Sequence, residues 1–219
     1  MSYRVAKSDS SEVTADWQSP IWHDIKPLEL TYHLGERPKH FPNTQAKLRY
    51  DDQALYVIFR VEDRYVRAVA PRHQADIWHD SCAEFFFSPT SEVSTAFMNI
   101  EMNCGGTMLF HYQTAPGETP TKLTSDDISE IEVAHSQPKI VEPEITEPTV
   151  WTIAYRLPFE LIAKYYPSAT RPAAGVRWRA NFYKCADKTS HPHWLTWNEV
   201  DHPSPNFHLP QFFGTLEFE

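Results

Sequence analysis

The chain has 219 residues, which is enough for one large β domain with a sizeable core. Its 20 Lys and Arg residues against 29 Asp and Glu residues give a formal charge of −9, which argues against a nucleic-acid groove or an anionic membrane as its partner. The longest strictly apolar run, residues 54–59, is too short to span a bilayer, and the polar first twenty residues do not resemble a signal peptide. The compartment stays open: cytoplasmic as the sequence stands, secreted or periplasmic if a leader was removed.

The composition favours β structure. The chain is 14% aromatic and has 18 prolines and 6 glycines. Prolines gather in loops and at strand edges, and helical periodicity is nearly absent. One short helix is predicted over residues 158–166, ending before Pro167. Cys82, Cys104 and Cys185 are odd in number and lack metal-type spacing, so at least one thiol is free.

The first third of the chain contains the best local prediction. Residues 1–25 are expected to form an irregular arm with Trp17 and Trp22 tucked against the body, and residues 26–34 could form a first strand. Two alternating runs, 44–50 and 54–62, flank an Asp-rich turn and predict a hairpin. The second run is apolar on both faces, which predicts a strand covered on both sides.

Further strands follow at regular spacing. Alternating runs predict strands over residues 81–88, 95–103, 107–113, 150–157, 175–185 and 214–218. A Gly-Gly pair supplies the turn before residue 107, and the acidic, proline-punctuated stretch 125–148 is expected to be edge-like. No repeat or linker divides the chain. We therefore expect a single domain over residues 1–219, an all-β, two-sheet antiparallel sandwich of immunoglobulin-like type with one short helix.

The segment from Trp78 to Phe87 (WHDSCAEFFF) is the most informative for function. Alternation puts Cys82, Glu84 and Phe86 on one face of a strand, so a carboxylate lies on a half-buried surface. A flat aromatic ring before such a carboxylate suits a sugar, whose C–H face stacks on the ring while its hydroxyls donate to the carboxylate. The alternative is a structural ion pair between Glu84 and a neighbouring arginine, Arg177 or Arg179.

Three blocks of the chain resemble the family 9 carbohydrate-binding modules, which are DOMON-like β-sandwiches. The first block runs from Leu48 to Asp63, with a hairpin, Leu-Tyr-Val and then Asp. The second is the Trp78–Phe87 segment, with Trp, Asp-Ser and Glu before a hydrophobic strand. The C-terminal part, from Trp178 to Gly214, resembles a stand-alone branch of the family. The resemblance covers about residues 20–219.

The resemblance implies non-catalytic carbohydrate binding, with glycoside hydrolases in polysaccharide breakdown as the related enzymes. A sugar would lie between two tryptophans. Trp78 matches the first ring and Glu84 the hydroxyl-binding carboxylate, while Trp194 or Trp197 would supply the second ring. Asn181 offers an amide either for a hydroxyl or for a hydrogen bond at a strand end.

The family also implies structural calcium. Asp63, Asp76 and Asp80 are the candidate ligands for the ion. Glu101 and Asn103, near the Gly-Gly turn, are interpreted as part of a solvated strand edge.

Other readings stay open. A haem-binding electron-transfer domain could use the residues Met98, Met102, Met108 and His111. Zinc could be imagined at His191, His193, His202 and His208, which lack ligand-type spacing. A scaffold with no small ligand is a third possibility. Catalysis by Asp80 and Glu84 is disfavoured, because four residues along a strand separate them by about 13 Å, too far for a glycosidase carboxylate pair. The sequence predicts no oligomeric state.

Overall fold

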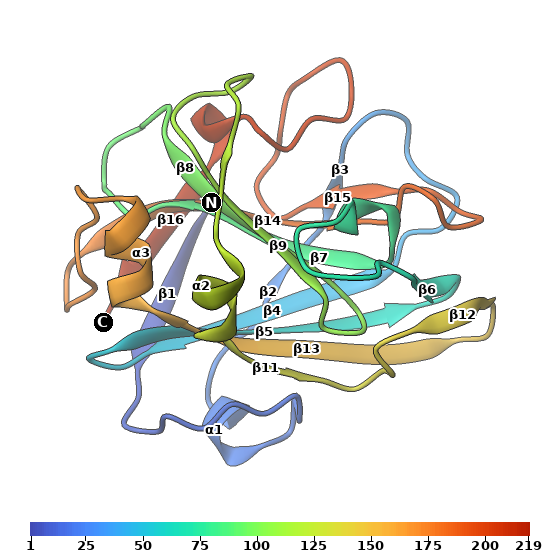
Figure 1. Ribbon diagram of the computed structural model, residues 1–219, viewed down its shortest axis with the longest axis horizontal. Coiled ribbons are helices and arrows are strands. Elements are labelled where there is room, and N and C mark those ends of the chain that lie inside the picture. The colour runs from blue at the N-terminus through green and yellow to red at the C-terminus, as the bar shows by residue number, and fades with distance from the viewer.

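The structure is a computed structural model that describes residues 1–219, and it is mostly β (Figure 1). Fourteen strands share one hydrogen-bonded sheet that curls on itself, and two form a small separate sheet. The strands of the large sheet are β1 (Ser2–Lys7), β2 (Leu28–Glu29), β3 (Tyr32–His33), β4 (Asn43–Tyr50), β5 (Ala54–Asp63), β7 (Cys82–Ser88), β8 (Phe97–Asn103), β9 (Met108–Gln113), β10 (Thr121–Lys122), β11 (Glu132–His135), β13 (Thr149–Pro158), β14 (Arg177–Cys185), β15 (Trp194–Thr196) and β16 (Gly214–Phe218). The small sheet pairs β6 (Val66–Ala68) with β12 (Val141–Ile145).

The curled sheet forms two layers. The first layer has the order β10-β9-β8-β7-β14-β16, and the second has the order β4-β5-β13-β11. Strand β1 joins them, because Ser2–Val5 pair with β16 and Ala6–Lys7 pair with β4, both in parallel. All other pairings are antiparallel. The predicted all-β sandwich class is confirmed, with one parallel strand added as the link between its layers.

The main core fills the space between the two layers. Alternate residues of β5, such as Val57 and Phe59, face alternate residues of β14, and the rings of Phe59 and Phe182 lie 6.0 Å apart. The other face of β5 is also buried, since Tyr56 and Ile58 pack against Trp22. The predicted two-sided burial of this strand is therefore confirmed.

The N-terminal segment corrects one prediction. Residues 2–7 form the layer-joining strand β1 rather than an irregular arm, because Tyr3 and Val5 alternate into the core. The rest of the segment does cover the body: Trp22 is buried, and Lys47 Nζ lies 4.4 Å from the centre of the Trp17 ring. The predicted first strand, 26–34, is instead divided into the short strands β2 and β3.

Helices are few and short. The predicted helix is α3 (Phe159–Tyr165), while α1 (Pro20–His23) and α2 (Ser125–Ser129) were not predicted. Two short 3-10 turns, η1 (Ile77–His79) and η2 (Pro210–Phe212), complete the elements. None of the helices has the length and the apolar character needed to cross a membrane.

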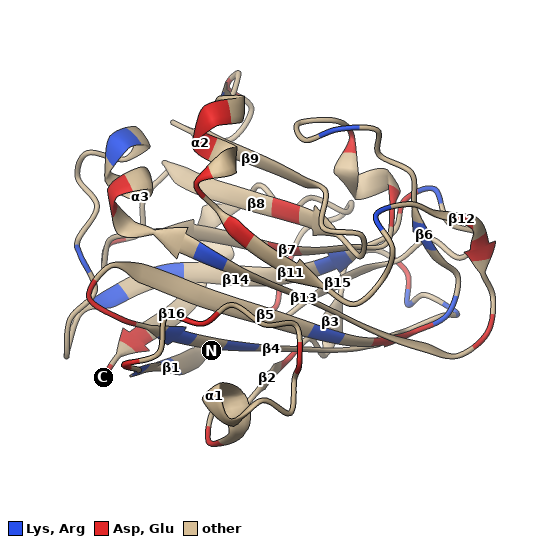
Figure 2. Cartoon of the chain, turned by 60° about the horizontal axis from the view of Figure 1, so that its bottom comes forward, with Lys and Arg blue, Asp and Glu red and all other residues tan.

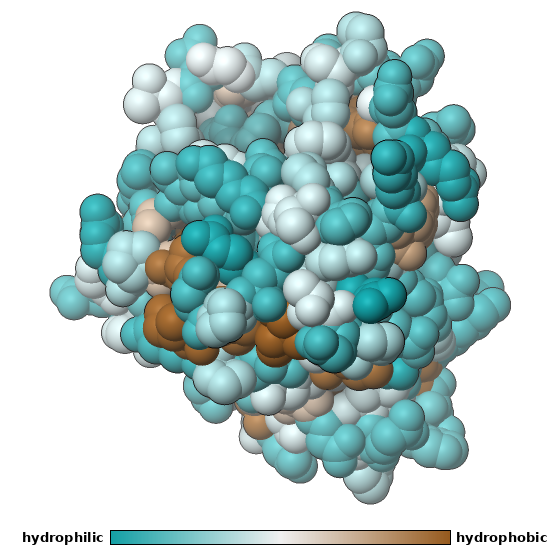
Figure 3. Space-filling view, turned by 90° about the vertical axis from the view of Figure 1, so that its right-hand side faces the viewer, coloured by the Kyte–Doolittle hydropathy of each residue, from teal (hydrophilic) through white to brown (hydrophobic).

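The outer face of the first layer carries a second, smaller core. Cys82 and Phe86 of β7 face outward and pack with Tyr183, with Ile77 of η1 and with the loop residue Phe207. Long C-terminal loops rise over this part of the sheet (Figure 1). Figure 3 shows the side of the molecule at the β6 and β12 end, which is mostly hydrophilic with a limited set of apolar side chains near its middle. The loops therefore cover part of the outer face of the first layer.

Candidate functional site

A cleft of about 570 Å³ opens on the outer face of the first layer. Its floor consists of strands β7, β8, β9 and the end of β14, and its walls consist of loops 116–120 and 205–208. This volume is within the range typical of small-ligand sites. The residues that line it are Trp78, Glu84, Glu101, Leu109, His111, Gln113, Pro116, Gly117, Glu118, Pro120, Cys185, Asp187, Trp194, Pro205, Asn206, Phe207 and His208.

Two carboxyl groups lie side by side on the floor. Glu84 of β7 and Glu101 of β8 are partners in the antiparallel register, so both side chains leave the same face of the sheet. Glu84 is 1% exposed and Glu101 is 5% exposed. Burial raises the pKa of Glu84 well above its usual value, and the neighbouring Cys185 and Glu101 raise it further. Burial likewise raises the pKa of Glu101 to about 8. Without a ligand the pair retains protons that exposed carboxyl groups lose.

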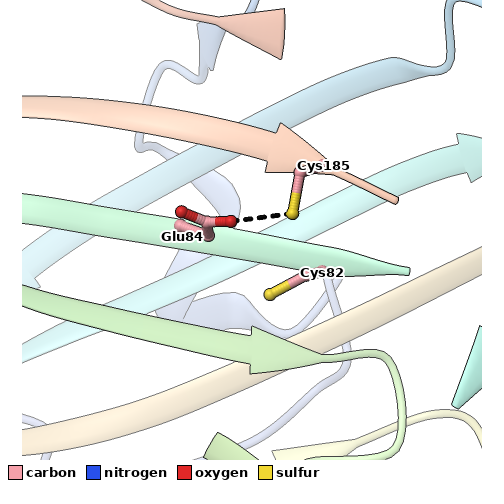
Figure 4. Close-up of side chains that lie close together, drawn as sticks. All are labelled: Cys82, Glu84 and Cys185. Atoms are coloured by element: carbon pink, nitrogen blue, oxygen red, sulfur yellow. Dashed lines mark hydrogen bonds between the residues drawn. The ribbon is translucent and has the colours of Figure 1, made fainter. Parts of the chain in front are cut away.

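Two thiols border Glu84 (Figure 4). Cys82 precedes it by two residues on the same strand, and Cys185 is the register partner of Cys82 on β14. The Cys185 thiol donates to Glu84 Oε1 at 2.9 Å. The ligand atoms of these three residues all lie within 4.8 Å of one another, so they are the one group of this kind whose donors could hold a metal ion. The thiol contact fixes the position of the Glu84 carboxyl at the cleft floor.

Glu101 is held from one side only. Asn99 Nδ2 donates to Glu101 Oε1 at 3.1 Å, and Gln113 Nε2 lies 3.2 Å from Asn99 Oδ1 and 2.7 Å from His208 Nδ1. This chain of amides orients the carboxyl from behind. Its other oxygen, Oε2, is buried and has no protein partner. A buried acceptor without a donor is unfavourable, so this oxygen is available to a ligand.

The two partly buried tryptophans of the cleft are tied to the same loop. Trp194 Nε1 donates to Asp187 Oδ1 at 2.8 Å. The backbone N–H of Asp187 donates to the carbonyl of Trp78 at 3.1 Å. Asp187 therefore fixes the Trp194 ring through its side chain and the Trp78 backbone through its main chain. Burial raises the pKa of the Asp187 carboxyl.

Two of the sequence-predicted sugar-binding residues lie outside the cleft. Trp197 is 4% exposed, and its ring packs edge-on against Phe182 at 5.6 Å in the main core. Asn181 is fully buried, and its amide bonds the backbone of Asn198 in both directions, at 3.0 and 2.9 Å. Asn181 makes the strand-end hydrogen bonds that were its alternative role. Among the predicted residues, the structure brings together Trp78, Glu84 and Trp194.

The alternative of a structural ion pair for Glu84 is not what the structure shows. Arg177 faces Glu217 at 3.6 Å, and Arg179 donates to Thr215 Oγ1 at 2.9 Å and to the backbone of Phe213. Both arginines therefore have other partners. Glu84 keeps its place at the cleft floor.

The three aspartates considered for calcium do not gather into one group. Asp63 is buried between the layers, where His40 and Trp151 contact its oxygens at 2.7 and 3.1 Å. Asp80 Oδ2 accepts from the backbone N–H groups of Val69 and Ala70, and its Oδ1 has no hydrogen-bond partner. Asp76 is exposed at the start of η1. Most of the carboxylate oxygens of Asp63 and Asp80 are thus already bonded to groups of the protein.

The side chains considered for haem and zinc are also dispersed. The three methionines pack in the main core, whereas His111 faces the cleft on the opposite side of the sheet. Among the four histidines, His193 is buried with its Nε2 2.7 Å from Lys184 Nζ, and His191 stacks on Tyr65 at 3.6 Å. His202 lies in a later loop, where its ring bonds the backbone of Ser204. The haem residues Met98, Met102 and Met108 therefore do not share a surface with His111.

Several cleft residues carry no signal in the sequence or one that points elsewhere. Glu101 was interpreted as part of a solvated edge, but it is buried at the cleft floor because β7 and β9 flank β8 on both sides. Strand alternation combined with the β7–β8 and β8–β9 hairpin order would have placed Glu101 and His111 on the face of Glu84. Asp187, Asn206 and His208 come from loops, and no local pattern signals them.

Comparisons with known proteins show which folds and which family this chain resembles. A crystal structure of a protein from Bacteroides uniformis ATCC 8492, provisionally described as carbohydrate-binding, is 26% identical with a TM-score of 0.84, covering 100% of this chain and 99% of that one. Family 9 modules from Caldicellulosiruptor kristjanssonii, in complex with cellotriose and with glucose, are 13% identical with TM-scores of 0.65 and 0.66. They cover 100% of this chain and 94% and 96% of theirs, and they share its fold.

The sequence comparisons differ in outcome. A search of curated proteins gave no match. The sequence profile described as "Carbohydrate-binding family 9" matches residues 28–218, which is most of the chain. The chain belongs to carbohydrate-binding family 9, a non-catalytic family.

Proposed function

We propose that the cleft on the first layer is the carbohydrate-binding site of this protein, with Trp78 and Trp194 contacting the sugar ring and Glu84 accepting hydrogen bonds from its hydroxyls. The observation that carries the proposal is that two partly buried tryptophans and a buried carboxyl group meet in one cleft. Aromatic faces stack on the C–H face of a sugar, and a carboxyl group distinguishes hydroxyls by hydrogen bonding.

The relatives support this proposal. The family is a carbohydrate-binding one, and two of the structures with the same fold are complexes with cellotriose and with glucose. Glucose and its β-linked oligomers are therefore the first ligands to test. The cleft also offers polar groups beyond Glu84. Glu101, Asp187 and Asn206 line it and could contact further hydroxyls.

The test is isothermal titration with glucose and cello-oligosaccharides, preceded by a glycan array that finds the preferred saccharide. The wild-type protein should bind, and Trp78→Ala should weaken binding beyond detection while its melting temperature stays near that of the wild type. Trp17→Ala is the matched control, because Trp17 is also partly buried but packs against the second layer, away from the cleft. Absence of binding to any saccharide, or full-strength binding by Trp78→Ala, would overturn the proposal.

A further inference from the structure

The cleft is acidic and no Lys or Arg lines it, while burial lowers the pKa values of its two histidines, His111 and His208. Glu84, Glu101, Glu118 and Asp187 contribute carboxyl groups, and no Lys or Arg is present. The floor strands β7, β8 and β9 contain neither Lys nor Arg, and β8 in Figure 2 shows acidic but no basic colour. Such a cleft attracts cations and repels anions.

The nearest lysines are committed elsewhere. Lys184 lies on the cleft strand β14 but points between the layers, where its Nζ lies 3.6 Å from Asp63 and 2.7 Å from His193. Lys122, the register partner of His111 on β10, is exposed and does not line the cleft. No cation of the protein therefore neutralises the floor carboxyls.

Two buried polar atoms that line the cleft lack partners. Glu101 Oε2 accepts no hydrogen bond although the residue is 5% exposed, and His111 Nε2 makes none although the residue is 8% exposed. They lie on neighbouring strands, β8 and β9, with both side chains on the cleft face. Buried polar groups are normally satisfied, so two unpaired atoms at one floor indicate that a ligand supplies their partners.

We propose that the sugar recognised by this cleft carries a protonated amine, that is, a hexosamine unit with a free amino group, and that Glu101 is the residue that pairs with the ammonium. This inference rests on the proposed function and specifies its ligand class. An ammonium group offers three donors and a positive charge, whereas a hydroxyl offers one donor and no charge. It therefore satisfies Glu101 Oε2 and also compensates the carboxyl groups around it.

The tryptophans favour the same ligand class. A cation near an aromatic face is attracted by the ring quadrupole, and tryptophan gives the strongest such interaction. Trp78 and Trp194 line the cleft together with Glu101, so one amino sugar can contact a ring and a carboxyl group at once. N-acetylation removes the charge of the amine and enlarges the group, and it should remove the preference.

The experiment compares glucosamine, glucose and N-acetylglucosamine by isothermal titration at about pH 6.5, where the amine is protonated. The raised pKa keeps the Glu101 carboxyl protonated at this pH without a ligand, and the charge of a bound ammonium lowers that pKa, so the carboxyl releases its proton when the amino sugar binds. Glucosamine should bind at least tenfold more tightly than either neutral sugar. Added salt should weaken the binding of glucosamine and leave that of glucose unchanged, because only the charged ligand is screened.

The substitution Glu101→Gln keeps the shape of the side chain and removes the carboxylate that forms when the ammonium binds. It should weaken glucosamine binding by about tenfold and change glucose binding by less than about twofold. Glu92→Gln is the matched control, since Glu92 is an exposed loop residue outside the cleft whose substitution changes the net charge equally. Melting temperatures establish that both variants are folded.

Each outcome has a distinct meaning. Glucose or N-acetylglucosamine binding as tightly as glucosamine, or Glu101→Gln weakening all three sugars equally, would overturn the amino-sugar inference and leave carbohydrate binding intact. Failure of every saccharide, neutral or charged, would instead overturn the proposed function.

Discussion

Buried carboxyl groups in two regions of the molecule, one between the layers and one on the outer face of the first layer, differ in how they are compensated. Asp63, in the space between the layers, lies 3.6 Å from Lys184 Nζ and is contacted by His40 and by the Trp151 indole. Burial alone would raise its pKa, but the Lys184 charge and the His40 hydrogen bond together hold the pKa well below the usual value. Glu84 and Glu101, on the outer face, have no cation beside them, and their pKa values are raised.

The difference separates a structural role from a binding role. A buried charge is stable only when the protein supplies an opposite charge and hydrogen-bond donors. Asp63 has both from the fold itself. Glu101 has a donor for one oxygen and an accessible cleft beside the other. A buried carboxyl that the fold leaves incomplete, at the wall of a cleft, is therefore the better candidate for ligand contact.

The largest expected effect comes from a substitution that removes the ion pair between Asp63 and Lys184. Asp63→Asn leaves the Lys184 charge buried without its partner and should lower the free energy of unfolding by about 3–5 kcal/mol. Urea denaturation measures this change. Glu101→Gln is the comparison and should leave stability at neutral pH unchanged or increase it, because it replaces an uncompensated acid by a neutral amide. Equal destabilisation by both substitutions would remove the distinction between the two groups.

The second effect is a dependence of stability on pH. A carboxyl group whose pKa is raised in the native state holds a proton that the unfolded chain has already lost. The native state therefore binds more protons, and stability falls as pH rises. For Glu101 the contribution is complete below the unfolded pKa near 4.5 and is lost as pH rises through about 8.

Thermal or urea unfolding between about pH 5 and pH 9 should show that the free energy of unfolding falls by about 2–4 kcal/mol over this range. Glu84 contributes to this fall in the same direction. Glu101→Gln should flatten most of this slope. A wild-type profile that is flat over the range, or a variant profile as steep as the wild type, would contradict the assignment of raised pKa values to the cleft pair.

The third effect contrasts two tryptophans. Trp78→Ala should reduce sugar affinity by about 2 kcal/mol or more while unfolding near the wild-type midpoint, since the ring is partly exposed at the cleft. Trp151→Ala should instead destabilise the fold by about 3–5 kcal/mol, because this ring is fully buried and donates to Asp63. Titration and denaturation of both variants test the contrast. If the Trp78 variant melted as early as the Trp151 variant, Trp78 would be a residue of the core and not of the binding site.

The fourth effect concerns Glu84. Glu84→Gln keeps the shape of the side chain but replaces a carboxyl acceptor and weakens its hydrogen bonds, so affinity should fall by about 1 kcal/mol. Titration calorimetry measures it. Glu144→Gln serves as the control and should bind normally, because Glu144 is a partly buried acidic residue that bonds Ser190 and does not line the cleft.

The smallest expected effect is that of chelation. The carboxylate oxygens of Asp63 and Oδ2 of Asp80 already accept hydrogen bonds from the protein, and Asp76 does not form a group of metal ligands with them. EDTA should therefore shift the melting temperature by less than about 1 °C, with calcium giving no reverse shift. A marked drop on chelation, restored by calcium, would show that the loop carboxylates hold an ion.

Much of the fold followed from local pattern. The alternation of residues 54–63 and the turn chemistry of Asp51, whose side chain accepts from the N–H groups of Gln53 and Ala54, predicted the hairpin of β4 and β5. The faces of β7 were likewise predictable, and Trp78 and Glu84 could be singled out from one segment. Periodicity of two defines which side chains share a face without reference to the rest of the chain.

Tertiary structure decided the rest. The role of β1 depends on pairing with β16 and β4, which are far from it in sequence, so its short alternating run could not distinguish a joining strand from an arm. The choice of Trp194 over Trp197 for the cleft depends on the face of the sheet to which each ring points, since Trp194 packs with the outer cluster and Trp197 with the main core. The pairing of Glu84 with Glu101, the position of Asp187 and the direction of Lys184 toward Asp63 all arise from contacts between strands and loops. Sequence alone determines the faces of strands, but the charge environment of a carboxyl depends on which faces meet, and only the folded chain establishes that.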